Sequence, residues 1–175
     1  MWSHEPSRRG LLLALAGGVL AACQVRPVYA PASTSGSGTG PLAALGSIAI
    51  ETQTDRVAQA LVNELIFALR GGAALATPAL YRLHLIVTER VTDLAIEAGS
   101  DLPTAKLVTI TATFTLTENA NGRAVVSDTV FETTSFDFSA QRFANIRAQR
   151  DAEDKLARSL ATDIRMRLAM ALTKG

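Results

Sequence analysis

Residues 108–117 read VTITATFTLT, and this stretch decides the fold. Apolar side chains occupy the even positions from Val108 to Leu116, and threonine occupies every odd position. A period of two residues is typical of a β-strand with one buried face, and threonine supplies β-branching on the face that stays polar. The stretch therefore predicts a strand in a sheet that is covered on one face only.

The segments next to this strand predict its two neighbours. Residues 119–122 read NANG, which is typical of a hairpin turn because Asn and Gly tolerate positive φ angles, so Arg123 to Phe136 should return as a partner strand. Residues 99–103 are expected to form the turn that precedes the strand. The segment before that turn alternates in the same way, and its expected buried positions are Tyr81, Leu83, Leu85 and Val87.

Further out, the pattern predicts one more strand and two helices. Residues 47–52 suggest a short strand, followed by a helix that Thr54 or Asp55 can cap and that Gly71-Gly72 ends. Residues 140–172 contain no Pro or Gly and predict one long helix. The fold class is therefore α+β, with two helices packed on one face of a four-stranded sheet in the order β-α-β-β-β-α.

The first residues have the layout of a secretory signal. Arg8 and Arg9 precede an apolar run from Leu11 to Ala22, which is shorter than the stretch of about 20 residues that a helix needs to cross a membrane. The arginine pair also resembles a twin-arginine export signal, so the sequence leaves the ordinary and the twin-arginine routes open.

Residues 20–23 read LAAC and resemble the lipobox, the tetrapeptide at which bacteria attach lipid to a cysteine and cleave before it. We therefore expect residues 1–22 to be a signal peptide and Cys23 to carry diacylglycerol and palmitate. Gln24 follows the cysteine, which favours the outer membrane over retention at the inner one. Residues 23–45, rich in Ser and Gly, should form a lipidated flexible tether, and residues 46–175 a single domain.

The charge balance argues against bulk attraction to nucleic acid. The chain has 17 basic and 16 acidic residues, and 15 of each remain without residues 1–22. A local cationic set is nevertheless expected on the polar sheet face, where it could bind phosphates by charge-assisted hydrogen bonds or simply keep the face soluble. The set consists of Arg82, His84 and Arg90, with Arg123 near the turn and Lys106 as an edge candidate that its position assigns to the buried face.

The sequence predicts no enzyme, metal site or cofactor. His84 is the single histidine after residue 22, and no second histidine or free thiol accompanies it. The motifs of serine hydrolases, nucleotide-binding loops and dithiol sites do not occur.

Three stretches together resemble the LptE family of lipopolysaccharide-assembly lipoproteins. Residues 23–29, CQVRPVY, are similar to the start of its mature members, and residues 50–69 to its first strand and helix. Residues 143–153, FANIRAQRDAE, and residues 161–168 are similar to its last helix, especially in alphaproteobacterial members.

The resemblance implies two helices on a four-stranded sheet, the same fold that the residue pattern predicts. It also implies a periplasmic-face lipoprotein of the outer membrane that plugs the LptD β-barrel, so that the pair inserts lipopolysaccharide into the outer leaflet. The resemblance also implies that lipopolysaccharide is bound through basic residues of the sheet. No residue-by-residue match identifies them in this sequence, so Arg82, Arg90 and Arg123 are candidates from their chemistry alone. The alternative is a periplasmic auxiliary lipoprotein of a lipid ABC-transport system.

Overall fold

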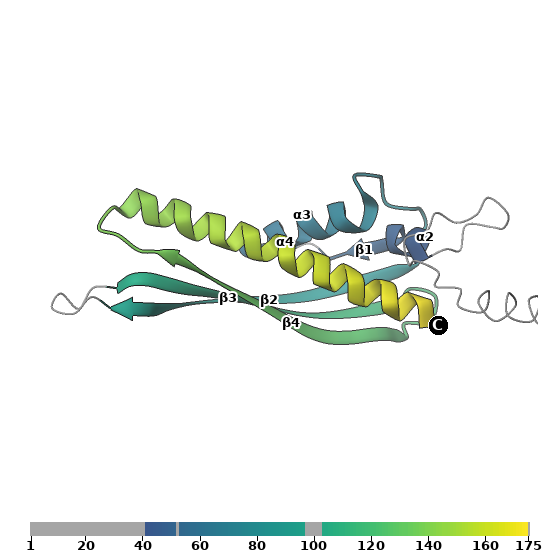
Figure 1. Cartoon of the computed structure of the whole chain (residues 1–175). Helices are drawn as coiled ribbons and strands as arrows, with labels where there is room; N and C mark the ends of the chain where they lie inside the picture. The colour runs from purple at the N-terminus through teal and green to yellow at the C-terminus, as the bar shows by residue number, and fades with distance from the viewer. Residues whose placement is uncertain (1–40, 52, 97–102, 175) are drawn as a thin grey trace, which may run out of the picture. The chain divides into compact units, whose positions relative to one another are not determined.

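The computed structural model describes residues 41–51, 53–96 and 103–174. The expected signal peptide, Cys23, nearly all of the expected tether and most of the turn at residues 99–103 lie outside them. The fold is α+β, as the sequence predicted, with one additional short helix (Figure 1). Its elements are α2 (Pro41–Gly46), β1 (Ile48–Ile50), α3 (Arg56–Arg70), β2 (Tyr81–Ile96), β3 (Pro103–Glu118), β4 (Ala124–Asp137) and α4 (Arg142–Lys174).

The four strands form one mixed sheet in the order β1-β2-β3-β4. β1 is parallel to β2, and the other two pairs are antiparallel. The even positions of β3 from Val108 to Leu116 are all buried, which confirms the alternation that predicted this strand. β2 and β3 extend about five residues further than their apolar patterns suggested. Their backbone pairing continues through Asp93 and Lys106, whose side chains form an ion pair at 2.9 Å.

Local signals explain where the first long helix begins and ends. The Asp55 carboxylate accepts hydrogen bonds from the backbone N–H groups of Val57 at 3.0 Å and Ala58 at 3.2 Å. Gly71 ends α3 in the left-handed conformation, at φ 60°. Nothing in the sequence predicts α2; it forms where Leu45, only 1% exposed, packs into the core.

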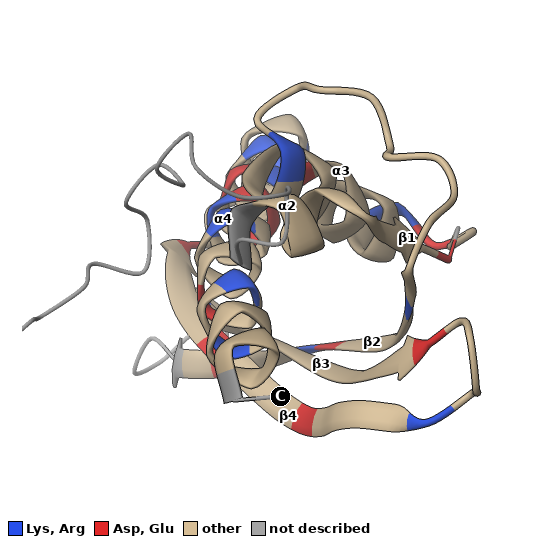
Figure 2. Ribbon diagram, turned by 90° about the vertical axis from the view of Figure 1, so that its right-hand side faces the viewer, with Lys and Arg blue, Asp and Glu red and all other residues tan. Residues whose placement is uncertain are grey.

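Both long helices lie on one side of the sheet, which we call the inner face (Figures 1 and 2). The end where β1 pairs with β2 is called the proximal end, and the end at Ile96, Pro103 and Asp137 is called the distal end. α3 covers the proximal part of the inner face, whereas the first turns of α4 run alone over the distal end (Figure 1). From Ala152 onward one face of α4 is buried in the core, whereas none of its residues from Arg142 to Asp151 is buried.

Candidate functional site

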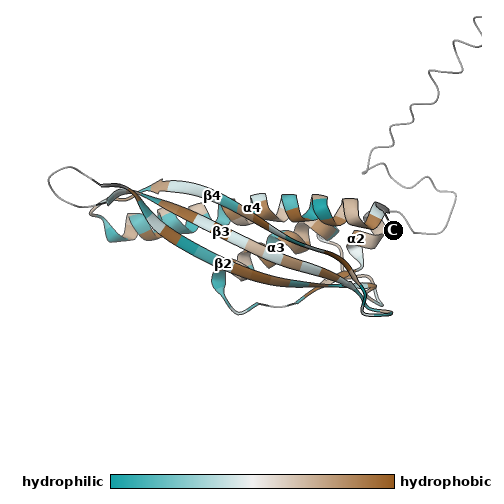
Figure 3. Cartoon of the chain, turned by 90° about the horizontal axis from the view of Figure 1, so that it is seen from below, coloured by the Kyte–Doolittle hydropathy of each residue, from teal (hydrophilic) through white to brown (hydrophobic). Residues whose placement is uncertain are grey.

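The sheet face opposite the helices, which faces the viewer in Figure 3, is called the outer face, and the threonines of β3 form a ladder along it. Alternate residues of β3 point to this face and are half-buried, in register with Ser127, Thr129 and Thr133 of β4. Two cross-strand pairs are hydrogen-bonded, Thr113 to Thr129 at 3.0 Å and Thr115 to Ser127 at 2.9 Å. The face is therefore ordered and polar although neither long helix of the described residues covers it.

The structure does not bring the predicted cations together. Arg82 pairs in register with Thr117, next to the proximal hairpin that contains Arg123. Arg90 pairs with Thr109, eight residues further along β2, a separation of about 27 Å. Arg82 and Arg90 are exposed and have no acidic partner among the described residues, while Arg123 lies 3.8 Å from the Glu118 carboxylate. The positive charge of the outer face is therefore divided between two separate positions, one at Arg82 and one at Arg90.

His84 is hydrogen-bonded to a carboxylate and does not join a cationic cluster. Its Nδ1 lies 2.5 Å from Oε2 of Glu51, which follows β1. Both side chains are partly exposed, at 54% and 40%. The Glu51 carboxylate offsets positive charge beside Arg82, which weakens the case for a phosphate site that includes His84.

Two large apolar side chains interrupt the polar outer face. Phe131 is 70% exposed and Ile86 is 55% exposed. Phe131 pairs in register with Thr111, and Ile86 pairs with Thr113, so the two lie on neighbouring rows of the ladder. Exposed aromatic and β-branched side chains on a polar face are features of protein contact surfaces.

Lys106 lies on the inner face at the distal end, as its position in the strand predicted. Its Nζ is 2.9 Å from Asp93 Oδ1 and 4.6 Å from the centre of the Phe138 ring, a cation–π distance. The side chain is 24% exposed. Lys106 is therefore held at a fixed point, away from the sheet face that carries Arg82 and Arg90.

A pocket of about 640 Å³ opens between the distal end of the sheet and the start of α4, and we call it the distal pocket. Such a volume is within the range of small-molecule sites. The lining consists of Val91, Pro103, Thr104, Lys106, Phe136, Phe138, Ser139, Ala140, Arg142, Asn145, Ile146 and Gln149. Arg142, Asn145, Ile146 and Gln149 are spaced by three and four residues, so one stripe of α4 forms the wall opposite the strands.

A polar layer separates this pocket from the proximal core. The buried Glu153 carboxylate on α4 forms an ion pair with Arg56 of α3. Gln149 Nε2 donates to Glu153 Oε1 at 2.8 Å and to Glu89 Oε1 of β2 at 3.4 Å. These groups tie α4 to both α3 and β2 at the position where the apolar core stops.

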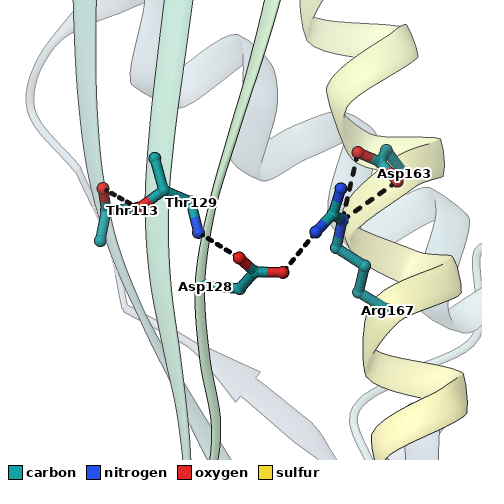
Figure 4. Close-up of polar contacts among 5 residues, drawn as sticks. All are labelled: Thr113, Asp128, Thr129, Asp163 and Arg167. Atoms are coloured by element: carbon teal, nitrogen blue, oxygen red, sulfur yellow. Dashed lines mark hydrogen bonds and ion pairs between the residues drawn. The ribbon is translucent and has the colours of Figure 1, made fainter.

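A second pocket, between β4 and the end of α4, contains one arginine that pairs with two aspartates (Figure 4). Arg167 Nε donates to the two carboxylate oxygens of Asp163 at 3.2 and 3.3 Å, and Arg167 Nη1 pairs with Asp128. The hydrogen bond from Arg167, helped by one from the backbone N–H of Thr129 at 2.8 Å, lowers the pKa of Asp128 below its ordinary value. The hydrogen bond to Asp163 raises the pKa of Arg167. This cluster joins sheet to helix, and because its single cation already pairs with two carboxylates, it does not suit an anionic ligand.

Within the described residues, no group of three or more His, Cys, Asp or Glu side chains could hold a metal ion. Basic and acidic positions are interspersed along α4 from Asp151 to Arg167, whereas the charged residues of its first turns, Arg142, Arg147 and Arg150, are all basic. Figure 2 shows where the charged positions lie on the ribbon. In the same part of the chain, no helix is both long enough and apolar enough to cross a membrane. What the described part offers is surfaces and pockets for binding.

The sequence pointed to the outer face and missed the distal pocket. The aromatic side chains of the distal pocket are Phe136, near the end of β4, and Phe138, in the connection to α4. The two-residue alternation that identifies a strand gives little information at such positions. Ile146 extends the apolar stripe of α4 beyond the core, and Lys106 breaks the apolar pattern of the inner face. These two irregularities together were the available hint of a ligand site.

A family model described as "LptE: Lipopolysaccharide-assembly" matches residues 45–168. The match runs from α2 to the last turns of α4 and covers every strand. No curated protein matches the chain in sequence.

Two solved structures share the fold. A candidate lipoprotein from Caulobacter crescentus superposes with a TM-score of 0.66 at 25% identity, over 77% of this chain and 96% of that one. A minor lipoprotein from Acinetobacter baumannii superposes with a TM-score of 0.54 at 20% identity, over 70% and 88% of the two chains. Both are similar to this chain along most of their own length.

Proposed function

The chain belongs to the LptE family, whose members serve in lipopolysaccharide assembly, and from this premise we propose that it is the outer-membrane lipoprotein partner of an LptD β-barrel. In this role the domain binds and plugs the barrel during the insertion of lipopolysaccharide into the outer leaflet, and it makes or breaks no bond. The family match over residues 45–168 is the observation that carries the proposal.

The outer face of β2, β3 and β4 is the surface that would enter the barrel. The interior of a membrane β-barrel is polar and wet, and a hydrogen-bonded threonine ladder suits such surroundings. Phe131 and Ile86 would supply the apolar contacts, because each is more than half exposed in the free domain. The helices cover the inner face and leave this one accessible (Figure 3).

Lipid on Cys23 would hold the domain at the periplasmic face of the outer membrane. Buried acyl chains contribute membrane affinity of about 0.8 kcal/mol per methylene group. The tether between Cys23 and the first described residue would let the domain reach the barrel. Replacing Cys23 with Ser should abolish labelling by a palmitate analogue and release the protein from membranes, and unchanged labelling would exclude this anchor.

Arg82, Arg90 and Arg123 are the proposed lipopolysaccharide contacts of the outer face. Arginine binds phosphate oxygens in a bidentate manner, and the first two residues have no acidic partner among the described residues. Because Arg82 and Arg90 are about 27 Å apart, they would contact separate anionic groups.

The partnership is tested by purifying the full-length, C-terminally tagged protein from detergent-solubilised membranes. We expect one large, heat-modifiable β-barrel protein to accompany it. Recovery with an inner-membrane ATPase complex would instead favour the auxiliary lipoprotein of a lipid transporter, and recovery alone would refute the partnership.

A matched pair of variants locates the contact surface. Phe131→Arg places a charge on the outer face, and we expect it to reduce barrel recovery at least tenfold. Phe67→Arg is the control, because Phe67 is similarly exposed, at 67%, but lies on α3 on the helix side. Equal recovery with both variants would exclude the outer face as the contact.

The arginine sites are tested by the double variant Arg82→Ala/Arg90→Ala. We expect its affinity for purified lipopolysaccharide to fall about tenfold or more, as the loss of two charge-assisted contacts implies. Arg147→Ala/Arg158→Ala removes two exposed arginines of α4 and should leave binding unchanged. Unchanged affinity in the sheet variant would remove the outer-face arginines from the proposal.

A further inference from the structure

The distal pocket combines apolar walls with two basic side chains. Its aromatic and aliphatic walls come from β2, from β4 and the residue after it, and from α4, through Val91, Phe136, Phe138 and Ile146. Among the described residues that line the pocket, the charged ones are Lys106 and Arg142, and both are basic. A cavity with apolar walls and two basic side chains is complementary to an apolar ligand that carries an anionic group.

The two cations differ in how far they are already neutralised. Lys106 is held between the Asp93 carboxylate, at 2.9 Å, and the Phe138 ring, so its position is fixed before any ligand arrives. Arg142 is exposed and has no acidic partner among the described residues. An ammonium nitrogen has three donors, of which one is directed to Asp93. Donors therefore remain available from both side chains.

The stripe of α4 that lines the pocket continues the stripe that forms the core. Ala152, Leu156 and Leu160 are buried, whereas Ile146, about two turns before Ala152 on the same helix, remains 40% exposed. Val91 on the opposite wall is 38% exposed. Val91 and Ile146 are thus only partly covered by the described chain, so a ligand that covers their exposed surface gains hydrophobic free energy.

We propose that the distal pocket binds one fatty acyl chain of an acylated, phosphorylated glycolipid, with an anionic group of that lipid at Lys106 and Arg142. This inference rests on the proposed function, since lipopolysaccharide is the lipid of this chemistry that the protein would meet. It adds a site on the inner face of the sheet, away from the outer-face arginines. The acyl chain lies between β2, β4 and α4, and the polar layer at Gln149 and Glu153 limits how deep it enters.

Photocrosslinking of the full-length protein in living cells tests the site. The photoreactive residue p-benzoylphenylalanine replaces Ile146 in the pocket or, as a control, the exposed Phe67 on α3. We expect an adduct that reacts with an antibody to lipopolysaccharide from position 146 and none from position 67. A protein adduct at 146, or no adduct there, would overturn the proposal.

The role of the charge is tested in the same cells. Adding Lys106→Met should reduce the lipid adduct at position 146 by about tenfold, the effect of losing one charge-assisted hydrogen bond, and Lys106→Arg should retain most of it. Lys155→Met is the matched control, because Lys155 is 62% exposed on α4 and, among the described residues, pairs with Asp151 alone. Equal adduct yields in the two methionine variants would refute the anion site.

The pocket and the proposed function can fail separately. If the barrel still co-purifies but position 146 gives no lipid adduct, the pocket proposal alone is wrong. If the lipid adduct forms but no barrel accompanies the protein, the pocket stands and the partnership is wrong.

Discussion

The proximal and distal ends of the sheet are built from the same strands but are covered differently. At the proximal end, α3 and α4 close over the inner face, and Phe114, Leu116 and Ile164 are at most 1% exposed. At the distal end α4 is the one helix of the described residues that lies above the strands, and Val91 and Ile146 stay more than a third exposed. Stability therefore resides mainly at the proximal end, and the distal end keeps apolar surface for a ligand.

The largest expected effect comes from removing a proximal core side chain. Phe114→Ala should lower the free energy of unfolding by about 3–5 kcal/mol, since a fully buried aromatic ring leaves a cavity. Phe136→Ala at the distal end should cost only about 1–2 kcal/mol, because that ring is half-buried beside the pocket. Urea denaturation measures both, and equal losses would contradict the division into two ends.

A smaller loss is expected from breaking the polar layer between the ends. Arg56→Leu leaves the Glu153 carboxylate buried without its cation, at a cost near the lower end of about 3–5 kcal/mol because Arg56 is itself 46% exposed. The double variant Arg56→Leu/Glu153→Leu should recover most of this loss, since no unpaired charge remains. A double variant less stable than Arg56→Leu would show that the ion pair itself stabilises the boundary.

Substitution in the proximal hairpin should cost about 1 kcal/mol. Gly122 has a φ of 70°, and a methyl group there would meet no neighbour within 4 Å, so Gly122→Ala acts through backbone strain alone. Gly46→Ala is the control, because Gly46 has equal space but no positive φ. Thermal unfolding should distinguish the two variants, and identical Tm values would contradict the argument from strain.

The smallest effect is expected at the link between β4 and the end of α4, and it should depend on pH. Arg167 lowers the pKa of Asp128 in the folded state, so the link stabilises above the unfolded pKa of about 4 and is lost as pH falls through the lower, folded value. Asp128→Asn should therefore reduce stability at neutral pH, and the difference from wild type should shrink in acid. A difference that does not change between pH 7 and pH 2 would argue against the ionic link.

Much of the fold is encoded in local pattern. The alternation around Phe114, the NANG turn, the Asp55 cap and the long apolar stripe of α4 each specify one element, because each depends on neighbours within a few residues. The element order, and with it the expectation of two helices on one face of the sheet, followed from the sequence. The candidate phosphate ligands were likewise named from the polar face of one strand.

Only the tertiary structure decided which of those candidates lie together. Arg82 and Arg90 share a face and remain far apart, because a strand advances about 3.3 Å with each residue. Lys106 and Ile146, 40 positions apart in the sequence, line one pocket because α4 returns over the distal strands. Periodicity assigns each residue a face within its own element, but the overlap of two elements depends on their lengths and packing. In this structure α3 stops short of the distal strands, so the sheet is less covered at that end.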